Sequence, residues 1–301
     1  MTIFEAKQFG NKEINSPTTS LDVNCILEYI TGFSKTQLLL NSKNELSVEQ
    51  ESDFLEAIKK RQTGLPIAYI TGHKEFYGYD FFVTPDVLIP KPDTEILVEK
   101  TLEVIWNNSF YKNNDFFFTD VCTGSGCVGI SIALQIIEKT NSCPKVFLTD
   151  ISPKALEIAK KNVKHLIPKE FQNQFYFLQG DLLTVFENKT NHNLIVSNPP
   201  YIPSYMVDEL LMDGRNEPRL ALDGDFDSAI NKKSDEEGLA IIKRLIEQSK
   251  KILLPNGTLI LETGEYNAKK TAQIAKEMGF DSTQIYKDLA EQLRVVKIIQ
   301  N

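Results

Sequence analysis

The chain reads Asp120-Val121-Cys122-Thr123-Gly124-Ser125-Gly126 at the end of an apolar segment, 116–121. That segment is aromatic and β-branched, which predicts a strand, and a helical apolar pattern over 127–139 follows the glycines. Glycines at such a junction let the backbone turn sharply and approach a ligand closely. The turn is not a phosphate loop of the Gly-x-x-x-x-Gly-Lys type, because no lysine follows. A ligand-binding turn and a tight turn without a ligand are both open from this stretch alone.

Predicted strands and helices alternate from here to the end of the chain. We expect strands at 116–121, 145–150, 174–179, 193–197, 257–262, 280–286 and 293–299, and helices at 127–139, 153–165, 235–253 and 266–278. This alternation predicts an α/β fold with a seven-stranded, mostly parallel sheet covered by helices on both faces. A short loop joins the last two strands, so we expect that pair to be antiparallel.

The preceding residues have a different character. Helical patterning runs over 20–61, where Ser47 and Gln50 have the spacing of a capping box. Residues 66–92 are rich in aromatic and β-branched side chains broken by glycines, which indicates a β-hairpin. We therefore divide the chain into a helical bundle at 1–65, a β-hairpin linker at 66–92 and the α/β domain at 93–301.

Two polar segments stand outside these patterns. Residues 1–20 are rich in Asn, Ser, Thr and Pro, so we expect them to be poorly ordered or a loose helix. Residues 223–238 are polar and predict a surface insertion.

Composition and charge exclude several protein classes. The chain has 301 residues, of which 42% are hydrophobic and 25% charged, as in soluble globular proteins. No apolar run approaches the ~18 residues of a membrane span, and the N-terminus lacks the apolar core of a signal peptide. We therefore expect a cytoplasmic protein. The net charge of −8 argues against direct binding to DNA, which proteins usually hold through lysine and arginine.

The cysteines and histidines do not form a recognisable metal site. None of the four cysteines makes a Cys-x-x-Cys pair, and the three histidines are scattered. We expect free, reduced cysteines and no metal.

Acidic residues follow the second and third predicted strands. Asp150 ends the second strand, where a carboxylate can accept from both hydroxyls of a ribose. A helix N-cap is the alternative, although Ser152 can fill that role. Gly180 and Asp181 follow the third strand, and the Asp181 carboxylate could accept from an adenine amino group. A simple turn residue is the alternative there.

The strongest signal follows the fourth predicted strand, where the chain reads Asn198-Pro199-Pro200-Tyr201. Two prolines remove two backbone donors and stiffen the chain. The Asn198 side-chain oxygen and the Pro199 carbonyl then form a rigid row of acceptors, which suits a substrate –NH₂ group with two donors. Tyr201 offers an aromatic face to a flat group.

A glycine-rich turn, two acids and Asn-Pro-Pro-Tyr in this order resemble the class I methyltransferase fold, which is Rossmann-like. Within it, the chain resembles the release factor glutamine methyltransferases from about Arg61 to Val296. Segments outside the cofactor motifs carry this narrower resemblance. They are Pro66-Ile67-Ala68-Tyr69-Ile70-Thr71-Gly72-His73-Lys74-Glu75-Phe76, Leu88-Ile89-Pro90-Lys91-Pro92-Asp93-Thr94-Glu95 and Glu217-Pro218-Arg219-Leu220-Ala221-Leu222.

The resemblance implies methyl transfer from S-adenosylmethionine to the glutamine of the Gly-Gly-Gln loop in class I peptide chain release factors. We expect the bundle at 1–65 to bind the release factor. The implied catalytic residues are Asn198, Pro199, Pro200 and Tyr201, with Pro200 and Tyr201 as walls for the glutamine side chain. The implied cofactor-binding residues are Cys122, Thr123, Gly124, Ser125, Gly126, Asp150, Asp181, Leu182 and Asn198.

The chain departs from the family pattern at a few positions. Cys122 stands in place of glycine, Lys91 in place of arginine and Tyr266 in place of glutamine, and the segment between Asp225 and Gly238 is long. Two other functions fit part of the pattern. An N6-adenine DNA methyltransferase would use the same acceptor row but needs a basic target-recognition region, and a non-catalytic cofactor-binding module would transfer no methyl group. A dinucleotide oxidoreductase is a more distant alternative.

Overall fold

The computed structural model of the chain forms two compact units. They comprise Met1–His73 with Leu210–Asn216, and Lys74–Glu209 with Glu217–Asn301. The structure describes residues 1–113, 115–186, 191–212, 216–227, 232–233 and 237–300. Within these ranges no helix has the length and apolar character needed to cross a membrane.

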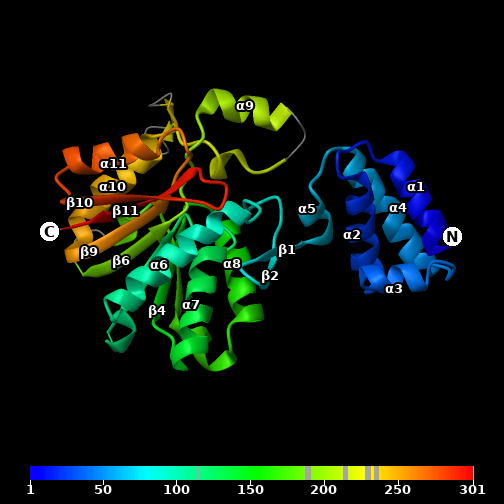
Figure 1. The fold of residues 1–301 in the computed structure, drawn as a ribbon, viewed down its shortest axis with the longest axis horizontal. Helices are drawn as coiled ribbons and strands as arrows, with labels where there is room; N and C mark the ends of the chain where they lie inside the picture. The colour runs from blue at the N-terminus through cyan, green and yellow to red at the C-terminus, as the bar shows by residue number, and fades with distance from the viewer. Residues whose placement is uncertain (114, 187–190, 213–215, 228–231, 234–236, 301) are drawn as a thin grey trace. The chain divides into compact units, whose positions relative to one another are not determined.

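The first unit is a bundle of short helices, α1 (Ile3–Glu13), α2 (Thr19–Thr31), α3 (Lys35–Leu40), α4 (Val48–Gln62) and α5 (Ile67–Thr71) (Figure 1). The predicted capping box is confirmed, because the Gln50 amide donates to Ser47 Oγ over 3.1 Å at the start of α4. Of the two alternatives for residues 1–20, a poorly ordered segment or a loose helix, the structure has a helix, α1. A second capping box, between Thr2 and Glu5, satisfies free backbone donors at the start of α1.

The hairpin is shorter than we expected. It consists of β1 (His73–Phe76) and β2 (Tyr79–Phe82), whereas residues 67–71 form helix α5. The β-branched residues there favour a strand, but Pro66 precedes the helix and Gly72 ends it at φ 76°. Proline and a left-handed glycine are the usual boundaries of a helix, and at this segment they outweigh side-chain propensity. From Lys74 onward the hairpin belongs to the second unit rather than to a separate linker.

The second unit is built on a seven-stranded sheet with the order β10-β11-β9-β6-β3-β4-β5 (Figure 1). The strands are β3 (Phe117–Val121), β4 (Lys145–Asp150), β5 (Phe175–Gln179), β6 (His192–Ser197), β9 (Leu253–Glu262), β10 (Ser282–Lys287) and β11 (Leu293–Ile299). β11 is antiparallel to both β9 and β10, while the pairs among β9, β6, β3, β4 and β5 are parallel. The predicted mostly parallel sheet and its antiparallel end are confirmed.

Helices cover both faces of this sheet (Figure 1). α6 (Glu95–Asn107), α7 (Cys127–Thr140) and α8 (Pro153–Leu166) lie on one face, and α10 (Ala240–Ile252) and α11 (Ala268–Glu277) on the other. Because side chains alternate along a strand, each strand feeds two separate cores. On β9, Ile260 packs with the α6–α8 core, while Leu259 and Leu261 pack with the α10–α11 core.

Two smaller features follow β6, and the first of them belongs to the second unit only as far as Glu209. Helix α9 (Ser204–Met212) follows β6, and the strand pair β7 (Phe226–Asp227) and β8 (Lys232–Lys233) falls in the predicted insertion at 223–238. Much of that insertion, 228–231 and 234–236, lies outside the described residues.

The sheet topology creates a crevice between β3 and β6. From β3 the chain proceeds outward through β4 and β5, and it then returns to β6 on the other side of β3. In open α/β sheets, ligands bind at the carboxyl ends of the strands where the order reverses in this way. The residues that follow β3, β4, β5 and β6 are therefore placed to bind a ligand.

A buried histidine at the start of β6 gives the fold a predicted sensitivity to acid. His192 is 1% exposed, and its two ring nitrogens have no hydrogen-bond partner among the described residues. Its ring meets the edges of Phe117 and Phe186, at centroid distances of 5.0 and 4.6 Å. Burial lowers the pKa of His192 from 6.5 to about 4. The unfolded chain therefore takes up this proton near pH 6.5, and the folded protein takes it up only near pH 4.

We expect the free energy of unfolding to fall by roughly 3 kcal/mol from this group as the pH drops from 6.5 to 4. Urea unfolding at pH 7.5 and pH 4.5 measures the loss, which should be clearly smaller in His192→Leu. Leu194→Val, a core change on the same strand without a titratable group, should lose as much on acidification as the unmodified chain. If the unmodified chain and both variants lose the same free energy of unfolding between pH 7.5 and pH 4.5, His192 is not the cause of the loss.

Candidate active site

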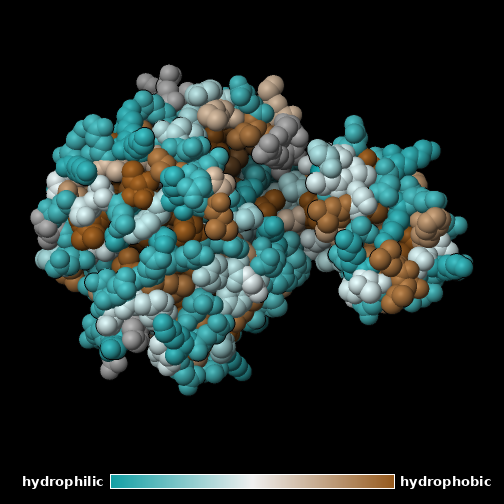
Figure 2. All heavy atoms as spheres, in the orientation of Figure 1, coloured by the Kyte–Doolittle hydropathy of each residue, from teal (hydrophilic) through white to brown (hydrophobic). Residues whose placement is uncertain are grey.

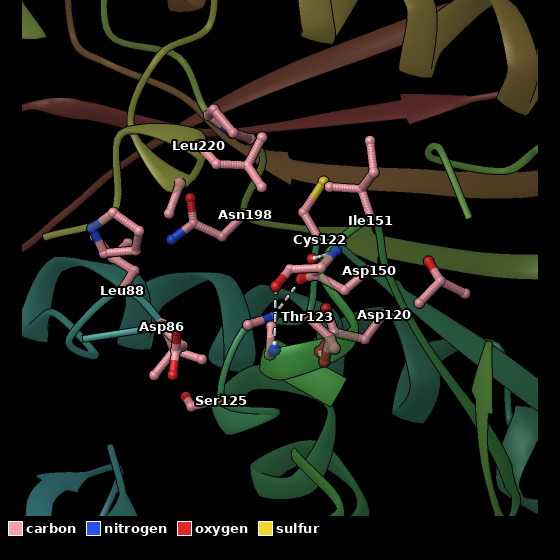
Figure 3. Close-up of a pocket in the computed structure, with 18 of the residues that line it drawn as sticks. Asp86, Leu88, Asp120, Cys122, Thr123, Ser125, Asp150, Ile151, Asn198 and Leu220 are labelled. Atoms are coloured by element: carbon pink, nitrogen blue, oxygen red, sulfur yellow. Dashed lines mark hydrogen bonds between the residues drawn. The ribbon is translucent and has the colours of Figure 1, made fainter. Parts of the chain in front are cut away.

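A cavity of about 420 Å³ opens at the carboxyl ends of β3, β4, β5 and β6 (Figure 3). Segments that are distant in the sequence surround it, of which four follow predicted strands and two carry the family resemblance. Of the predicted site residues, the cavity is lined by Cys122, Thr123, Gly124, Ser125, Asp150, Asp181, Leu182, Asn198 and Pro200. Gly126, Pro199 and Tyr201 are not among its lining residues.

In the glycine-rich turn after β3, every second residue has a left-handed backbone conformation. Cys122, Gly124 and Gly126 have φ values of 58°, 55° and 83°. A Cβ at Gly124 would meet no atom within 4 Å, so this glycine leaves room for a ligand. A Cβ at Gly126 would lie 2.8 Å from Ile130 Cδ1 and 3.3 Å from the Ala159 Cβ. Gly126 therefore serves the packing of α7 against α8 and not the cavity, where we had placed it.

Cys122 occupies a backbone conformation that favours glycine. A left-handed conformation costs an ordinary residue roughly 1–2 kcal/mol, which gives a physical reason for glycine at this position in the family pattern. The side chain packs against the α10–α11 core. Burial, followed by the charge of Asp150, raises the pKa of the Cys122 thiol, so it stays protonated and acts as a small apolar group.

Asp120 lines the cavity and was missing from our predicted site residues. It accepts a hydrogen bond from Thr123 Oγ1 over 2.6 Å and another from the Gly129 amide over 3.0 Å. Burial raises the pKa of Asp120 to about 7, while these two donors oppose the shift. The sequence did carry a signal for Asp120, because it is the first residue of the glycine-rich stretch Asp120–Gly126.

Asp150 projects into the cavity from the end of β4 (Figure 3). Its carboxylate accepts from the Gly124 amide and from the Ser152 amide, each over 2.9 Å. Burial raises the pKa of Asp150, and these backbone donors oppose the shift. Asp150 is not the N-cap of α8. Ser152 fills that position, and its Oγ accepts from the Ala155 amide. Two fixed donors leave the carboxylate oriented, with lone pairs still available for a ligand.

The residues after β5 line another part of the cavity. Asp181 accepts a hydrogen bond from the Arg244 guanidinium over 2.5 Å. Leu182 is buried at φ 55° and brings an apolar side chain to the cavity wall. The ion pair restrains the Asp181 carboxylate that we expected to face an adenine amino group.

The Asn-Pro-Pro segment after β6 is held at both ends. Upstream, Ser197 Oγ donates to the Val121 carbonyl over 2.7 Å. Downstream, the Tyr201 carbonyl accepts from Tyr266 Oη and Asn267 Nδ2, both over 3.2 Å. Tyr266, which replaces the family's glutamine, therefore supplies a hydrogen-bond donor of its own. Neither Asn198 Oδ1 nor the Pro199 carbonyl accepts a hydrogen bond from any described residue.

Tyr201 has surroundings that differ from those we expected. Its ring packs against the α10–α11 core, and its hydroxyl donates to Glu262 Oε1 over 3.0 Å. Tyr201 does not line the cavity. Burial, together with the nearby Glu262 charge, raises the pKa of the Tyr201 hydroxyl.

Two family-specific segments meet at the rim of the cavity. Pro90, Lys91 and Thr94 from one segment, and Pro218 to Ala221 from the other, line its wall. Buried Glu217 joins them, because it accepts from Lys91 Nζ over 2.7 Å and from the Ile89 amide over 3.3 Å. Lys91, which stands in place of the arginine of the family pattern, makes this ion pair through its single nitrogen. Sequence reasoning missed these segments as site residues, although it had singled them out.

Two glycines pack directly on the backbone of Tyr201. A Cβ at Gly224 would lie 2.7 Å from the Tyr201 Cα, and one at Gly238 would lie 2.1 Å from the Tyr201 carbonyl oxygen. The Ile202 amide donates to the Leu222 carbonyl, and the Gly224 amide donates to the Ile202 carbonyl, both over 2.9 Å. Gly224 and Gly238, which flank the 225–237 segment, therefore anchor both of its ends against Tyr201.

Comparisons with known proteins match this arrangement. The model of the PrmC N-terminal domain matches residues 6–72, and that of the methyltransferase small domain matches residues 105–213. A release factor glutamine methyltransferase of Clostridium acetobutylicum is 35% identical over 96% of this chain and 94% of its own length. One from Leptospira interrogans is 32% identical, over 98% and 96%. The chain belongs to the release factor glutamine methyltransferase family.

Solved structures share the fold at low identity. The hMettl16 catalytic domain in complex with MAT2A 3'UTR hairpin 1 aligns with a TM-score of 0.52 at 13% identity, covering 91% of this chain and 90% of that one. A T. thermophilus 16S rRNA methyltransferase (RsmC) in complex with AdoMet and guanosine has a TM-score of 0.51 at 14% identity, covering 76% and 50%. Both support the class I methyltransferase fold.

As in its family, the methyl donor of this methyltransferase is S-adenosylmethionine, and the cavity residues suit it. The open space at Gly124, the oriented carboxylate of Asp150 and the apolar wall at Leu182 provide a close approach, a hydroxyl acceptor and a nonpolar contact. Among the described residues, no cluster of three or more His, Cys, Asp or Glu side chains is arranged to hold a metal ion.

Asp150→Ala is expected to weaken S-adenosylmethionine binding by about 2 kcal/mol, the scale of a lost hydrogen bond to a charged group. Isothermal titration calorimetry measures this affinity. The matched control is Asp86→Ala, which removes another acid of the cavity rim that pairs with Lys154 in the solvent. Unchanged affinity in Asp150→Ala would remove Asp150 from the cofactor site.

Proposed function

We propose that this methyltransferase transfers a methyl group from S-adenosylmethionine to the side-chain amide nitrogen of the glutamine in the Gly-Gly-Gln loop of class I peptide chain release factors. The observation that carries the proposal is a pair of acceptors that receive no hydrogen bond from the described residues, Asn198 Oδ1 in the cavity wall and the Pro199 carbonyl beside it in the chain. Relatives named release factor glutamine methyltransferase match nearly the full chain.

The acceptor pair fits the chemistry of a primary amide. An amide nitrogen is a weak nucleophile because its lone pair is delocalised. When bound, S-adenosylmethionine supplies a sulfonium methyl group, which is a strong electrophile. Asn198 Oδ1 and the Pro199 carbonyl each accept one amide hydrogen and thereby orient the nitrogen. They also stabilise the positive charge that develops on it during methylation, which is a preorganised electrostatic effect.

The remaining residues position the substrate rather than exchange protons. Pro200 lines the cavity and forms a wall for the glutamine side chain. Tyr201, packed on the core, supports the segment from behind. Positioning of this kind accounts for a large part of the rate, since well-oriented reactions reach effective molarities of roughly 10⁵ M or more. The amide proton leaves to water once the nitrogen is alkylated.

A methyl-transfer assay with alternative acceptors tests the proposal. Purified release factor, the same factor with its Gly-Gly-Gln glutamine changed to glutamate, and duplex DNA are each incubated with radiolabelled S-adenosylmethionine. We expect labelling of the unmodified factor alone. Labelled DNA would favour an N6-adenine methyltransferase, and cofactor binding without any transfer would favour a non-catalytic module.

The proposed acceptor also places the enzyme in the cell. Release factors act on ribosomes, so we propose a cytoplasmic location, and we propose no direct role for DNA, in keeping with the net charge of −8. Mass spectrometry of release factors from cells that lack this protein would show the glutamine unmethylated.

A further inference from the structure

The proposed function needs the Asn198 side chain in one of two orientations. A half-turn of an asparagine amide exchanges an oxygen, which accepts, for an NH₂ group, which donates. Only the oxygen can receive a hydrogen from the substrate amide, because two NH₂ groups facing each other have no acceptor between them. Figure 3 shows the Asn198 nitrogen and oxygen pointing to different sides at the cavity wall. Some contact must select between the two orientations.

The Asn198 nitrogen has one protein partner in the described structure. Nδ2 donates to Thr94 Oγ1 over 3.2 Å. Thr94 is 2% exposed, in the 3₁₀ turn Pro92–Thr94 that leads into α6. Threonine at the start of a helix commonly caps a backbone N–H, but the Thr94 side chain makes no such bond. Its hydroxyl is therefore available for Asn198.

Thr94 alone cannot select the orientation, because a hydroxyl both donates and accepts. The selection needs a third group that commits the Thr94 hydrogen. Glu262, at the end of β9, is 1% exposed, and its Oε1 accepts from Tyr201 Oη over 3.0 Å. Its Oε2 is buried and accepts no hydrogen bond of regular geometry from the described residues. The Thr94 hydroxyl acts on this carboxylate as a donor, since it lowers the pKa of Glu262 against the effect of burial.

We propose that Thr94 and Glu262 are positioning residues that hold the Asn198 amide with its nitrogen toward Thr94 and its oxygen toward the substrate. An ionised carboxylate only accepts, so Glu262 draws the Thr94 hydrogen to itself. The Thr94 lone pairs then face Asn198 and can only accept from its nitrogen. The same carboxylate holds Tyr201, so one buried acid orders both ends of the Asn198–Tyr201 segment. This inference rests on the proposed function.

The charge of Glu262 makes the orientation of the Asn198 amide depend on pH, which turnover can report. Burial raises the pKa of Glu262 to about 7, against the opposing effects of the Tyr201 hydroxyl and Arg294. Arg294 on β11 is itself bonded to Asp288 over 3.0 Å and lies 3.3 Å from Asp93, and Cys127 on α7 also feels the Glu262 charge. A protonated Glu262 donates to Thr94, which is then free to donate to the Asn198 oxygen. Turnover should therefore fall as the pH drops through about 7.

The decisive comparison is Thr94→Val against Thr94→Ser. Valine has the shape of threonine without the hydroxyl, whereas serine keeps the hydroxyl. With release factor as substrate and saturating S-adenosylmethionine, we expect Thr94→Val to lower kcat about 10-fold, the effect of one lost hydrogen bond at its upper range. KM for the release factor and cofactor affinity should change little. Thr94→Ser should recover most of the rate.

Glu262→Gln supplies the second comparison. It should lower kcat and abolish the fall of kcat on the acid side of pH 7. Saturating cofactor separates this effect from Asp120, whose pKa is also raised to about 7 but which lies in the cofactor loop. Thermal melting of every variant confirms folding. A wild-type kcat in Thr94→Val, or equal losses in Thr94→Val and Thr94→Ser, would overturn the role of the hydroxyl.

A measurement without turnover separates this inference from the proposed function. In protein labelled with ¹⁵N-asparagine, the Asn198 NH₂ resonance is identified by its absence in Asn198→Ala. Thr94→Val should shift that resonance and Thr94→Ser should leave it near its original position. An unshifted resonance in Thr94→Val would overturn the inference, whereas failure of the unmodified enzyme to methylate release factor would overturn only the proposed function.

Discussion

Asn198→Ala is expected to lower kcat on release factor by about 10²–10³, the range for removing one preorganised electrostatic partner. Asn198 Oδ1 is the only side-chain acceptor in the proposed row. The turn should survive, because Pro199 and Pro200 still restrict the backbone and the Tyr201 carbonyl keeps its two donors. Steady-state kinetics with saturating cofactor measure the loss, and calorimetry should show cofactor affinity little changed.

Two further variants sharpen this test. Asn198→Asp restores an acceptor, but its charge beside the cofactor's sulfonium stabilises the bound ground state as well as the transition state. Its rate should therefore lie between those of the alanine variant and the unmodified enzyme. Pro199→Ala is the matched control, since it keeps the main-chain carbonyl and should lose much less than Asn198→Ala. Full activity in both Asn198 variants would reduce Asn-Pro-Pro-Tyr to a structural turn.

A chain that begins at His73 is expected to lose at least about 10² in kcat/KM on intact release factor. We propose that the first unit binds the release factor, and a loss of this size corresponds to ~2.7 kcal/mol, the scale of one or two strongly contributing interface side chains. The unit exposes large apolar side chains, with Leu39, Leu40 and Val48 at 63%, 80% and 90% exposure. Figure 2 shows apolar patches on the visible surface of this unit.

The matched comparison uses a short Gly-Gly-Gln peptide. The shortened and full-length chains should methylate it equally weakly, and their cofactor affinities should agree, because every cavity residue lies beyond His73. Leu40→Asp in the full-length chain removes an exposed apolar side chain without removing the unit and should raise KM for the intact factor. Unreduced activity of the shortened chain on intact release factor would contradict a binding role for the first unit.

The sequence was most informative where strands end. Parallel strands place their carboxyl ends at one edge of the sheet. The positions of Asp150 at the end of the second strand and Asn198 after the fourth were therefore enough to predict that both lie at one site. Glu262 ends the fifth predicted strand and carried the same signal, but its importance depends on its burial and on its interactions with Tyr201 and Arg294. Burial by residues distant in the chain is a tertiary property that strand spacing does not contain.

Two predicted site residues have surroundings that we did not expect, for physical causes of the same kind. Gly126 stands in a ligand-binding motif, yet its missing side chain makes room for Ile130 and Ala159. We expected the Tyr201 ring to face the ligand, but the ring packs on the α10–α11 core and its hydroxyl donates to the buried Glu262. In both cases a neighbour on another element determines the role, and no local pattern identifies that neighbour.

The contact of Gly224 and Gly238 with Tyr201 bears on how this family can diversify. Because both ends of the 225–237 segment are anchored beside the acceptor row, changes in its length are absorbed outside the anchor. Doubling such a loop costs only about 0.6 kcal/mol in closure entropy. Lineages can therefore lengthen or rewrite this segment to suit different protein acceptors while the chemistry beneath it stays constant. Selection should act severely on the two glycines and leniently on the residues between them.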